Sequence, residues 1–305
     1  MRPTTPNLIA YLLMAVAALI WAGNIVLGRA ASAAVPPVGL SFWRWTVAFA
    51  IFLPFVFPLV RRQWPVMRRE WRLLALLGLL GVFIFHTFLY IAVNTTTAIN
   101  AALIYAATPA LVPLLALPIL GDRLQFRQSL GIVLSMIGIA IIVTRADISV
   151  IGELEFTTGD LWMIAAVVAW SLYSVLVKRR PPDLHPNAML AGMMGIGIVM
   201  TAPFYAWETI TVRAMPLNAT AIWTVGYVAL FASIIAYICY NRGIELIGPS
   251  RAALTAHMLP VFAAGLSVFF LGETLHLFHL AGAAAVITGI VLSGGSSDTG
   301  SASTT

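Results

Sequence analysis

The chain contains the stretch Leu120-Gly121-Asp122-Arg123-Leu124 and repeats it about 151 residues later as Leu271-Gly272-Glu273-Thr274-Leu275. Two glycines follow each copy at the same spacing: Gly131 and Gly138, then Gly282 and Gly289. Both copies lie among strongly apolar residues. A duplicated apolar chain is typical of membrane proteins built from two similar halves, a plan that many secondary transporters share.

The composition supports this interpretation. The chain has 305 residues, of which 61% are hydrophobic and 9% charged, and its mean hydropathy is +0.96. An average soluble domain carries roughly 25% charged residues, so a chain this apolar could not cover a soluble surface with polar groups. The single cysteine, Cys239, excludes an intrachain disulfide.

The sequence predicts an all-α integral membrane protein with ten transmembrane helices in two five-helix inverted repeats. Each predicted segment is near the roughly 20 residues that cross the hydrocarbon core. The segments are Leu8–Leu27, Val38–Val60, Trp71–Ile91, Ala98–Leu120, Gln128–Val143, Asp160–Val177, Asn187–Ala206, Ala219–Tyr240, Arg251–Leu271 and Leu277–Leu292. We expect a first repeat at 1–145, an external linker at 146–158, a second repeat at 159–293 and a disordered tail at 294–305.

Lys and Arg residues predict the orientation. With both termini in the cytoplasm of a cell with an inner (plasma) membrane, the inside loops hold Arg2, Arg61, Arg62, Arg68, Arg69, Arg72, Arg123, Arg127, Lys178, Arg179, Arg180, Arg242 and Arg251. The outside loops hold only Arg29, Arg145 and Arg213. This asymmetry is a positive-inside signal. The basic residues face anionic lipid headgroups, so the net charge of +6 does not indicate a nucleic-acid-binding protein. Five helices per half is an odd number, so the second half enters the membrane from the opposite side.

Four stretches of the chain resemble the EamA-type branch of the drug/metabolite transporter superfamily. The first is Trp21-Ala22-Gly23-Asn24 with Arg29, then Phe42-Trp43-Arg44-Trp45, and the second runs from Ala101 through Thr108-Pro109 to Leu120-Gly121-Asp122-Arg123-Leu124. The third is Tyr240-Asn241-Arg242-Gly243 continuing to Gly248-Pro249-Ser250-Arg251-Ala252, and the fourth is Leu259-Pro260 through Leu271-Gly272-Glu273 to Gly282. The resemblance covers roughly residues 8–292. It implies ten helices, cytoplasmic termini and export of small metabolites, often amino acids.

The resemblance therefore predicts a secondary transporter, not an enzyme, that exports a small metabolite by alternating access. An amino acid, including an aromatic one, or a similar amphipathic solute is the leading substrate class. A sugar-nucleotide or drug permease is the alternative within transport, and a membrane enzyme acting on lipid is the alternative from another class.

Two polar pairs occupy matching places in the two halves. His86 and Tyr90 lie one helical turn apart, and at an offset of 151 they correspond to Tyr237 and Asn241. We predict that they form opposite walls of one substrate cavity. The alternative is that they form ordinary hydrogen bonds between helices.

Two basic side chains lie within predicted helices. Arg44 could meet a substrate carboxylate, or it could extend to the outer headgroups. His257 lies near the middle of its helix, where it could couple transport to protons or simply pack. No carboxylate falls at a predicted midplane, which favours downhill efflux over a carboxylate proton relay.

Aromatic and amide side chains complete the predicted binding site: Trp21, Asn24, Trp43, Tyr105, Trp170 and Tyr173. Trp21 and Asn24 share a helix face and correspond, about 149 residues on, to Trp170 and Tyr173. These faces suit apolar, aromatic or cationic groups. The alternative is an interfacial aromatic belt, to which we assign Trp64, Trp71, Trp207 and Trp223.

Matched prolines and glycines complete the pattern. Pro109 and Pro260 are predicted hinges, because a proline inside a helix frees a backbone carbonyl. Gly138 and Gly289 predict close helix packing, either within the chain or between the copies of a homodimer. The sequence lacks a nucleotide-binding P-loop and the common hydrolase motifs, so no cofactor is expected. His276, His279 and Glu273 are the only grouping near metal-ligand spacing, and no metal site is assigned to them.

Overall fold

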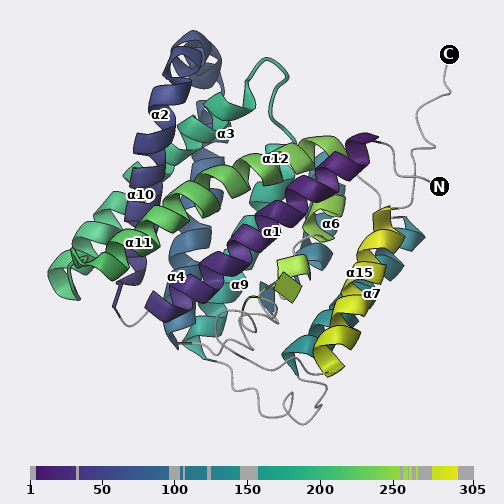
Figure 1. The fold of residues 1–305 in the computed structure, drawn as a ribbon. Coiled ribbons are helices and arrows are strands. Elements are labelled where there is room, and N and C mark those ends of the chain that lie inside the picture. Colours follow the sequence, from purple (N-terminus) through teal and green to yellow (C-terminus); the bar gives the residue numbers. More distant parts are fainter. Residues whose placement is uncertain are drawn as a thin grey trace.

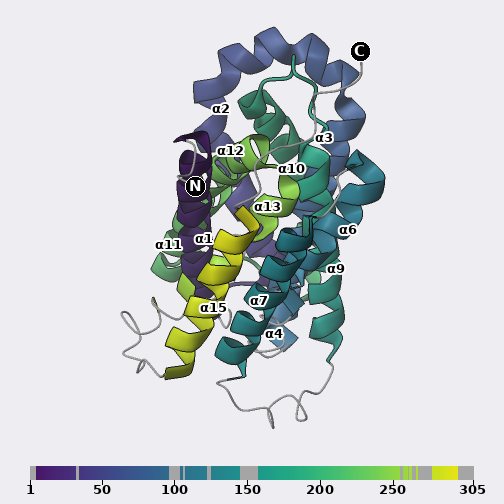
Figure 2. The same cartoon turned by 90° about the vertical axis from the view of Figure 1, so that its right-hand side faces the viewer.

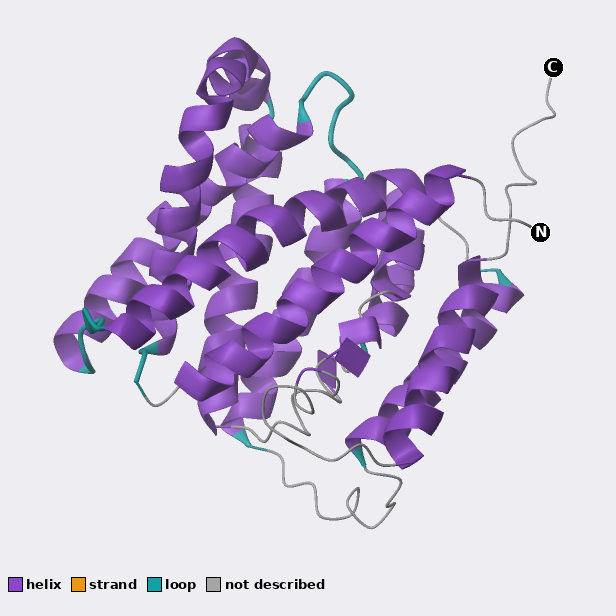
Figure 3. Cartoon of the chain, viewed as in Figure 1, coloured by secondary structure: helices purple, strands orange, loops and turns teal. Residues whose placement is uncertain are grey.

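The computed structural model describes residues 5–31, 34–95, 104–105, 107–121, 125–144, 157–254, 257–259, 261–262, 266 and 277–294. In these ranges every regular element is helical (Figure 3). The elements are α1 (Thr5–Ala31), α2 (Pro37–Arg69), α3 (Trp71–Leu77), η1 (Gly78–Ile84), α4 (Phe85–Thr95), α6 (Thr108–Leu120), α7 (Phe126–Val143), α9 (Thr158–Val177), α10 (Pro186–Thr211), α11 (Ala219–Tyr227), η2 (Val228–Ile235), α12 (Ala236–Ile247), α13 (Pro249–Leu254) and α15 (Leu277–Gly294).

Several helices can cross a membrane. In the described part of the chain six are long and apolar enough: Leu8–Gly28, Pro37–Arg69, Trp71–Thr95, Thr158–Val177, Pro186–Thr211 and Ala219–Ile247. Two further apolar helices, Leu111–Leu120 and Leu280–Gly289, are shorter than a full crossing. The protein is thus an all-helical, multi-pass membrane protein, but ten crossings are not confirmed. Two predicted segments, Ala98–Leu120 and Arg251–Leu271, lie partly outside the described residues.

Several helices are longer than the sequence predicted, and α2 and α10 show why. α2 continues from the predicted end at Val60 to Arg69, and its 33 residues span about 50 Å at 1.5 Å per residue, well beyond a core of about 30 Å. Its last turns therefore carry the arginines out of the apolar region. α10 continues past Ala206 to Thr211 and so includes Glu208. Apolar periodicity marks the membrane core well, but it does not mark how far a helix extends into water.

The two halves interleave. α1 packs against α12, α4 against α9, and α2 against α10, so each of these contacts joins one half to the other (Figure 1). We call the end of the bundle where α2 and α12 finish the arginine-rich end. The end where α2 begins and α10 finishes is the opposite end.

Two π-helices occupy matching positions in the halves. η1 interrupts the span Trp71–Thr95, and η2 interrupts the span Ala219–Ile247. Their first residues, Gly78 and Val228, differ by about the repeat offset. π-helical turns are rare and occur often at functional sites. Hydropathy cannot predict them, because they insert one residue into a turn without changing the apolar character of the segment.

The last helices of the two halves form a pair of their own. α7 and α15 lie side by side at the edge of the bundle (Figures 1 and 2). A Cβ atom on Gly138 would lie 2.8 Å from the backbone nitrogen of Val286, so only glycine allows this approach. Gly289 packs in the same way against Gly131 and Ser135. The small residues are therefore used within the chain, as one of the two sequence interpretations predicted.

Candidate transport pathway

A central aromatic cluster fills the middle of the bundle; its members are Trp21, Trp45, Phe85, His86, Trp170 and Tyr237. The ring centroids of Trp21 and Trp170 lie 5.2 Å apart, and those of Trp45 and Tyr237 lie 5.0 Å apart, both nearly perpendicular. Edge-to-face pairs of this kind contribute about 0.5–1.5 kcal/mol each beyond area burial. Trp21 and Trp170, which were expected to line a central chamber, are in direct ring contact across the two halves.

Carbonyl groups of the two π-helices bind side chains of this cluster. Tyr237 donates its hydroxyl hydrogen to the Gly81 carbonyl of η1, and His86 Nδ1 lies 3.0 Å from the same oxygen. In η2, the matching Ala232 carbonyl accepts a hydrogen bond of 3.0 Å from Trp21 Nε1. Residues from one half therefore satisfy the backbone of the other half. His86 and Tyr237 meet at one carbonyl, and both remain buried.

Gly81 has a second role in this arrangement. A Cβ atom there would lie 2.8 Å from Cε2 of Tyr173, so the absence of a side chain lets the tyrosine ring pack against η1. The Tyr173 ring in turn stacks on Trp170 at 5.1 Å. One glycine thus brings α9, η1 and the aromatic cluster together.

Arg44 is fully buried beside the aromatic cluster, on the side of the opposite end. Its Nε donates to Ser233 Oγ at 2.9 Å and its Nη1 donates to the Tyr90 hydroxyl at 2.7 Å. Its guanidinium carbon lies 5.2 Å from the Trp45 ring centroid and 5.8 Å from that of Tyr90. Nη2 has no hydrogen-bond partner among the described residues. In this geometry Arg44 does not extend to the headgroups; it is a cation inside the bundle.

Tyr90 and Asn241 belong to two equivalent hydrogen bonds. Tyr90 donates to Asn24 Oδ1 at 3.3 Å, whereas Tyr173 donates to Asn241 Oδ1 at 2.8 Å. At the repeat offsets Asn24 corresponds to Tyr173 and Tyr90 to Asn241, so the same amide–phenol bond occurs twice with its partners exchanged. Arg44 corresponds to Met193, whose sulfur lies 3.9 Å from the Tyr173 hydroxyl. The pseudo-symmetry is therefore close, but at this pair of corresponding positions only the first half has a cation.

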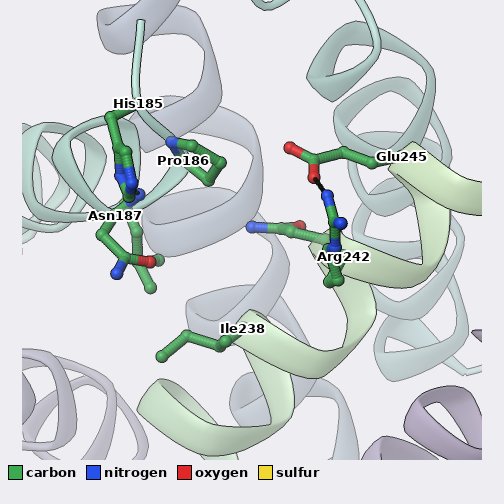
Figure 4. Close-up of a pocket in the computed structure, with 8 residues that line it drawn as sticks. His185, Pro186, Asn187, Ile238, Arg242 and Glu245 are labelled. Carbon is green, nitrogen blue, oxygen red and sulfur yellow. Dashed lines mark hydrogen bonds and ion pairs between the residues drawn. The ribbon is translucent and has the colours of Figure 1, made fainter. Parts of the chain in front are cut away.

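A cavity of about 250 Å³ opens at the arginine-rich end, between the start of α10 and the end of α12 (Figure 4). Its lining residues are His185, Pro186, Asn187, Leu190, Ile238, Asn241, Arg242 and Glu245. Asn241 lines the cavity and also accepts the hydrogen bond from Tyr173, so this residue lies between the cavity and the rings packed on the aromatic cluster. A second, almost wholly apolar cavity of about 340 Å³ lies between α2 and α10 and is lined by residues including Phe49, Trp64 and Ile196.

A carboxylate holds α2 at the opposite end. Pro36 supplies no side-chain cap to this helix, and Glu208 of α10 accepts hydrogen bonds from the backbone nitrogens of Val38 at 3.0 Å and Gly39 at 2.6 Å. Orphan N–H groups of a helix N-terminus favour a carboxylate. Nearby, the hydroxyl groups of Ser41 and Thr87 lie 3.1 Å apart and are buried. These contacts join α2, α4 and α10. The residues that correspond to Ser41 and Thr87 in the second half, Leu190 and Ile238, line the cavity instead.

Comparison with known sequences identifies this architecture. The model of the EamA-like transporter family matches residues 8–144 and again residues 157–295. The chain belongs to the EamA-like transporter family.

Relatives of this EamA-like protein extend over most of its length. It is 29% identical to the "Uncharacterized transporter YyaM" of Bacillus subtilis (strain 168), over 85% of each chain. It is 26% identical to the "Uncharacterized inner membrane transporter YedA" of Escherichia coli (strain K12), over 90% of this chain and 87% of the relative. A solved structure described as "Crystal structure of protein" matches with a TM-score of 0.71 at 21% identity, covering 93% and 95% of the two chains. The resemblance drawn from the motifs is confirmed, and the family consists of transporters, not enzymes.

The structure of this EamA-like chain does not bring all the predicted site residues together. Trp43 is partly exposed, and its Nε1 donates to the Tyr205 hydroxyl at 2.9 Å on the flank of α10. Tyr105 is buried, 6.5 Å from Phe85 between ring centroids. His257 is fully buried in the short described stretch 257–259. Pro109 lies in the first turn of α6, where a proline is well tolerated because its missing N–H has no helical partner. Pro260 lies outside the described residues.

Other residues of the site were not predicted. Trp45, Phe85 and Ser233 contact the predicted residues directly, and Glu208 lies just beyond the predicted segment Asn187–Ala206. For Trp45 the neighbouring Arg44 was a usable signal, since this arginine interrupts an otherwise apolar segment. Ser233 and Phe85 carried no such signal. Among the described residues no three potential metal ligands come together; His276 and Glu273 lie outside them.

Proposed function

We propose that this EamA-like protein is a secondary transporter that exports an amino acid, or a similar amphipathic solute with a carboxylate, by alternating access. We further propose ten spans in two inverted repeats at 1–145 and 159–293, an external linker at 146–158, and an inner-membrane location with the arginine-rich end in the cytoplasm. A homodimer would use helix faces other than the Gly138 and Gly289 contacts, which are made within the chain.

The observation that carries the proposal is the environment of Arg44. A charged side chain within a transmembrane helix costs about 2.5–3.5 kcal/mol on insertion scales, and such residues mark substrate or ion pathways. The described partners of Arg44 are hydroxyl groups and aromatic rings, with no carboxylate among them. A substrate carboxylate would supply the missing negative charge, and the adjacent rings would bind an apolar or aromatic side chain.

The same cation discriminates between substrate classes. A buried guanidinium repels cationic drugs, so it disfavours a cation permease. A sugar nucleotide carries negative charge and remains the alternative that a solute screen must include. No carboxylate lies in the central aromatic cluster as described, which supports downhill efflux over a carboxylate proton relay.

The test is counterflow in proteoliposomes that contain purified protein and are loaded with single amino acids, sugar nucleotides or cationic dyes. We expect exchange of a carboxylate-bearing amino acid, with aromatic ones favoured. Arg44→Gln should lower exchange roughly tenfold or more, since hydrogen bonds to charged groups contribute about 1.5–3 kcal/mol. The matched control is Met193→Leu at the repeat-related position, which should change exchange little. Exchange of cationic dyes that persists in Arg44→Gln would contradict the proposal.

Orientation has its own measurement. Single cysteines placed at Gln63 and Thr209, in a Cys239→Ser background, should react with membrane-impermeant reagents from opposite sides of intact cells. The reversed pattern would place the arginine-rich end outside and contradict the proposed orientation.

A further inference from the structure

The cavity at the arginine-rich end has a cluster of charged side chains on one wall. Glu245 accepts hydrogen bonds from Arg180 at 2.6 Å and from Arg242 at 2.8 Å, and its backbone carbonyl accepts one from Lys178 at 3.2 Å. Three cations thus surround one carboxylate. Glu245 keeps Arg180 as a partner even if Arg242 moves away. The cluster around Glu245 therefore has an excess of positive charge. Of its members only Arg242 and Glu245 line the cavity, and Arg242 can leave Glu245 without leaving the carboxylate unpaired.

Arg242 is the cation that can move. Its side chain is 58% exposed, whereas those of Arg180 and Glu245 are each 17% exposed. Figure 4 shows Arg242 and Glu245 on one wall of the cavity, with His185 and Asn187 on the facing wall. A guanidinium has five N–H donors in a planar fork that matches a carboxylate, so Arg242 can bind one without being buried first.

The remaining polar groups of the cavity add hydrogen-bond donors. Asn241 uses Oδ1 to accept from Tyr173, which leaves its amide NH₂ for the cavity. His185 Nδ1 accepts from the backbone nitrogen of Asn187 at 3.2 Å, so the proton of its neutral ring lies on Nε2. Donors gathered around a positive charge bind an acceptor with negative charge. A volume of about 250 Å³ equals that of roughly eight water molecules, enough for a small organic acid.

The repeat-related position in the first half lacks these features. At the offsets of 149 to 151, the lining residues correspond to Pro36, Pro37, Val38, Ser41, Thr87, Tyr90, Ile91 and Asn94, none of which is charged. Ser41 and Thr87, the counterparts of Leu190 and Ile238, are hydrogen-bonded to each other. The positive charge is therefore a property of one end and not a requirement of the fold.

We propose that this cavity is a binding site for the carboxylate of a small organic acid or zwitterion, with Arg242 as its principal ligand and the Asn241 amide as a second. The site rests on the proposed function in that it would load the solute before the solute reaches Arg44. Its occupancy, however, is a binding property that can be measured without transport.

The test uses benzoate as the probe, with benzamide and benzylamine as neutral and cationic analogues of nearly the same shape. The protein carries Cys239→Ser and Ile238→Cys in lipid nanodiscs, so that a maleimide reports on the apolar wall of the cavity. Millimolar benzoate should slow labelling at least threefold, and benzamide and benzylamine should have little effect. Arg242→Gln should abolish the protection, and Arg242→Lys should retain part of it. The matched control, Arg69→Gln at the same end, should leave protection unchanged.

Equal protection by benzoate and benzamide would overturn the proposal, because it would show an apolar pocket without anion recognition. Full protection in Arg242→Gln would overturn it as well. Folding of each variant is judged by its elution as a single species. If Arg242→Gln does not fold, the partial protection expected in Arg242→Lys tests the role of Arg242 instead. If benzoate protects the cavity but no amino acid is exchanged in proteoliposomes, the proposed substrate fails and the site stands.

Discussion

The two ends of the bundle are built from corresponding residues, yet the described residues form a polar contact between helices at one end and line a cavity at the other. At the opposite end, Ser41 and Thr87 share a buried hydrogen bond, and Glu208 holds the start of α2. At the arginine-rich end, the counterparts Leu190 and Ile238 line a cavity. There the start of α10 is capped by the side chain of His185, the residue that directly precedes the helix, whereas α2 is held by a carboxylate from another helix.

Under the alternating access proposed above, these two arrangements would correspond to the two states of a gate. Inverted repeats allow the two halves to exchange conformations, so that the closed geometry at one end is a template for closure at the other. By that reasoning, Leu190 and Ile238 would approach each other when the arginine-rich end closes. The contact there would be apolar, because neither residue can form the hydrogen bond that Ser41 and Thr87 form.

The largest expected effect comes from locking the closed end. In a Cys239→Ser background, Ser41→Cys with Thr87→Cys should form a disulfide under mild oxidation and abolish exchange, and reduction should restore it. Leu190→Cys with Ile238→Cys should cross-link far more slowly at rest, since a cavity separates them. Exchange that continues with the 41–87 disulfide formed would show that this contact is not a gate.

A smaller effect is expected from weakening the carboxylate that holds α2. Glu208→Gln keeps one acceptor oxygen but loses the negative charge and one of the two hydrogen bonds from the backbone of α2. A hydrogen bond to a charged group contributes about 1.5–3 kcal/mol. Labelling of a cysteine at position 41 should then accelerate roughly tenfold. Glu245→Gln, at the other end, is the matched control and should leave that rate unchanged. Equal acceleration by both variants would mean general loosening of the bundle.

The centre between the two ends should respond more modestly. Tyr237→Phe and His86→Ala each remove one interaction with the Gly81 carbonyl. Each should lower exchange by a similar factor, roughly threefold to tenfold, since a net hydrogen bond contributes about 0.5–1.5 kcal/mol. Both proteins should remain folded by size-exclusion chromatography. Unchanged exchange in both variants would show that these residues serve only packing between helices.

The smallest effect is expected at the exposed Asp183–Arg69 ion pair, whose atoms lie 2.7 Å apart. The Arg69 guanidinium lowers the pKa of the Asp183 carboxyl below its ordinary value. A lowered folded-state pKa means that the pair stabilises the protein above about pH 4, the ordinary range of a carboxyl, and loses that contribution as the pH falls through the lowered pKa. Asp183→Asn should lower the thermal midpoint slightly at pH 7 and not at all at strongly acidic pH. A large change at pH 7 would contradict the assignment of this pair to the solvated surface.

The sequence could predict which residues of the two halves correspond, because a repeat supplies two independent copies of each position. Trp21 with Trp170, and His86 with Tyr237, were paired by offset alone, and each pair is in contact or shares one acceptor in the structure. Trp43 is the instructive exception. It lies next to Arg44 in a family-like motif, but a difference of one residue on a helix is about 100° of rotation, which directs it toward Tyr205 and away from the cluster.

The sequence by itself determined the membrane class, the duplication, the family and the polar residues that interrupt apolar segments, because each of these follows from local composition and spacing. Only the tertiary structure decided the rest: the π-helices, the capping of α2 by Glu208 and the contrast between the two ends. The physical reason is that these features depend on contacts between helices far apart in the chain. Glu208 and Gly39 are 169 residues apart, and no local pattern records that the carboxylate of one would satisfy the backbone of the other.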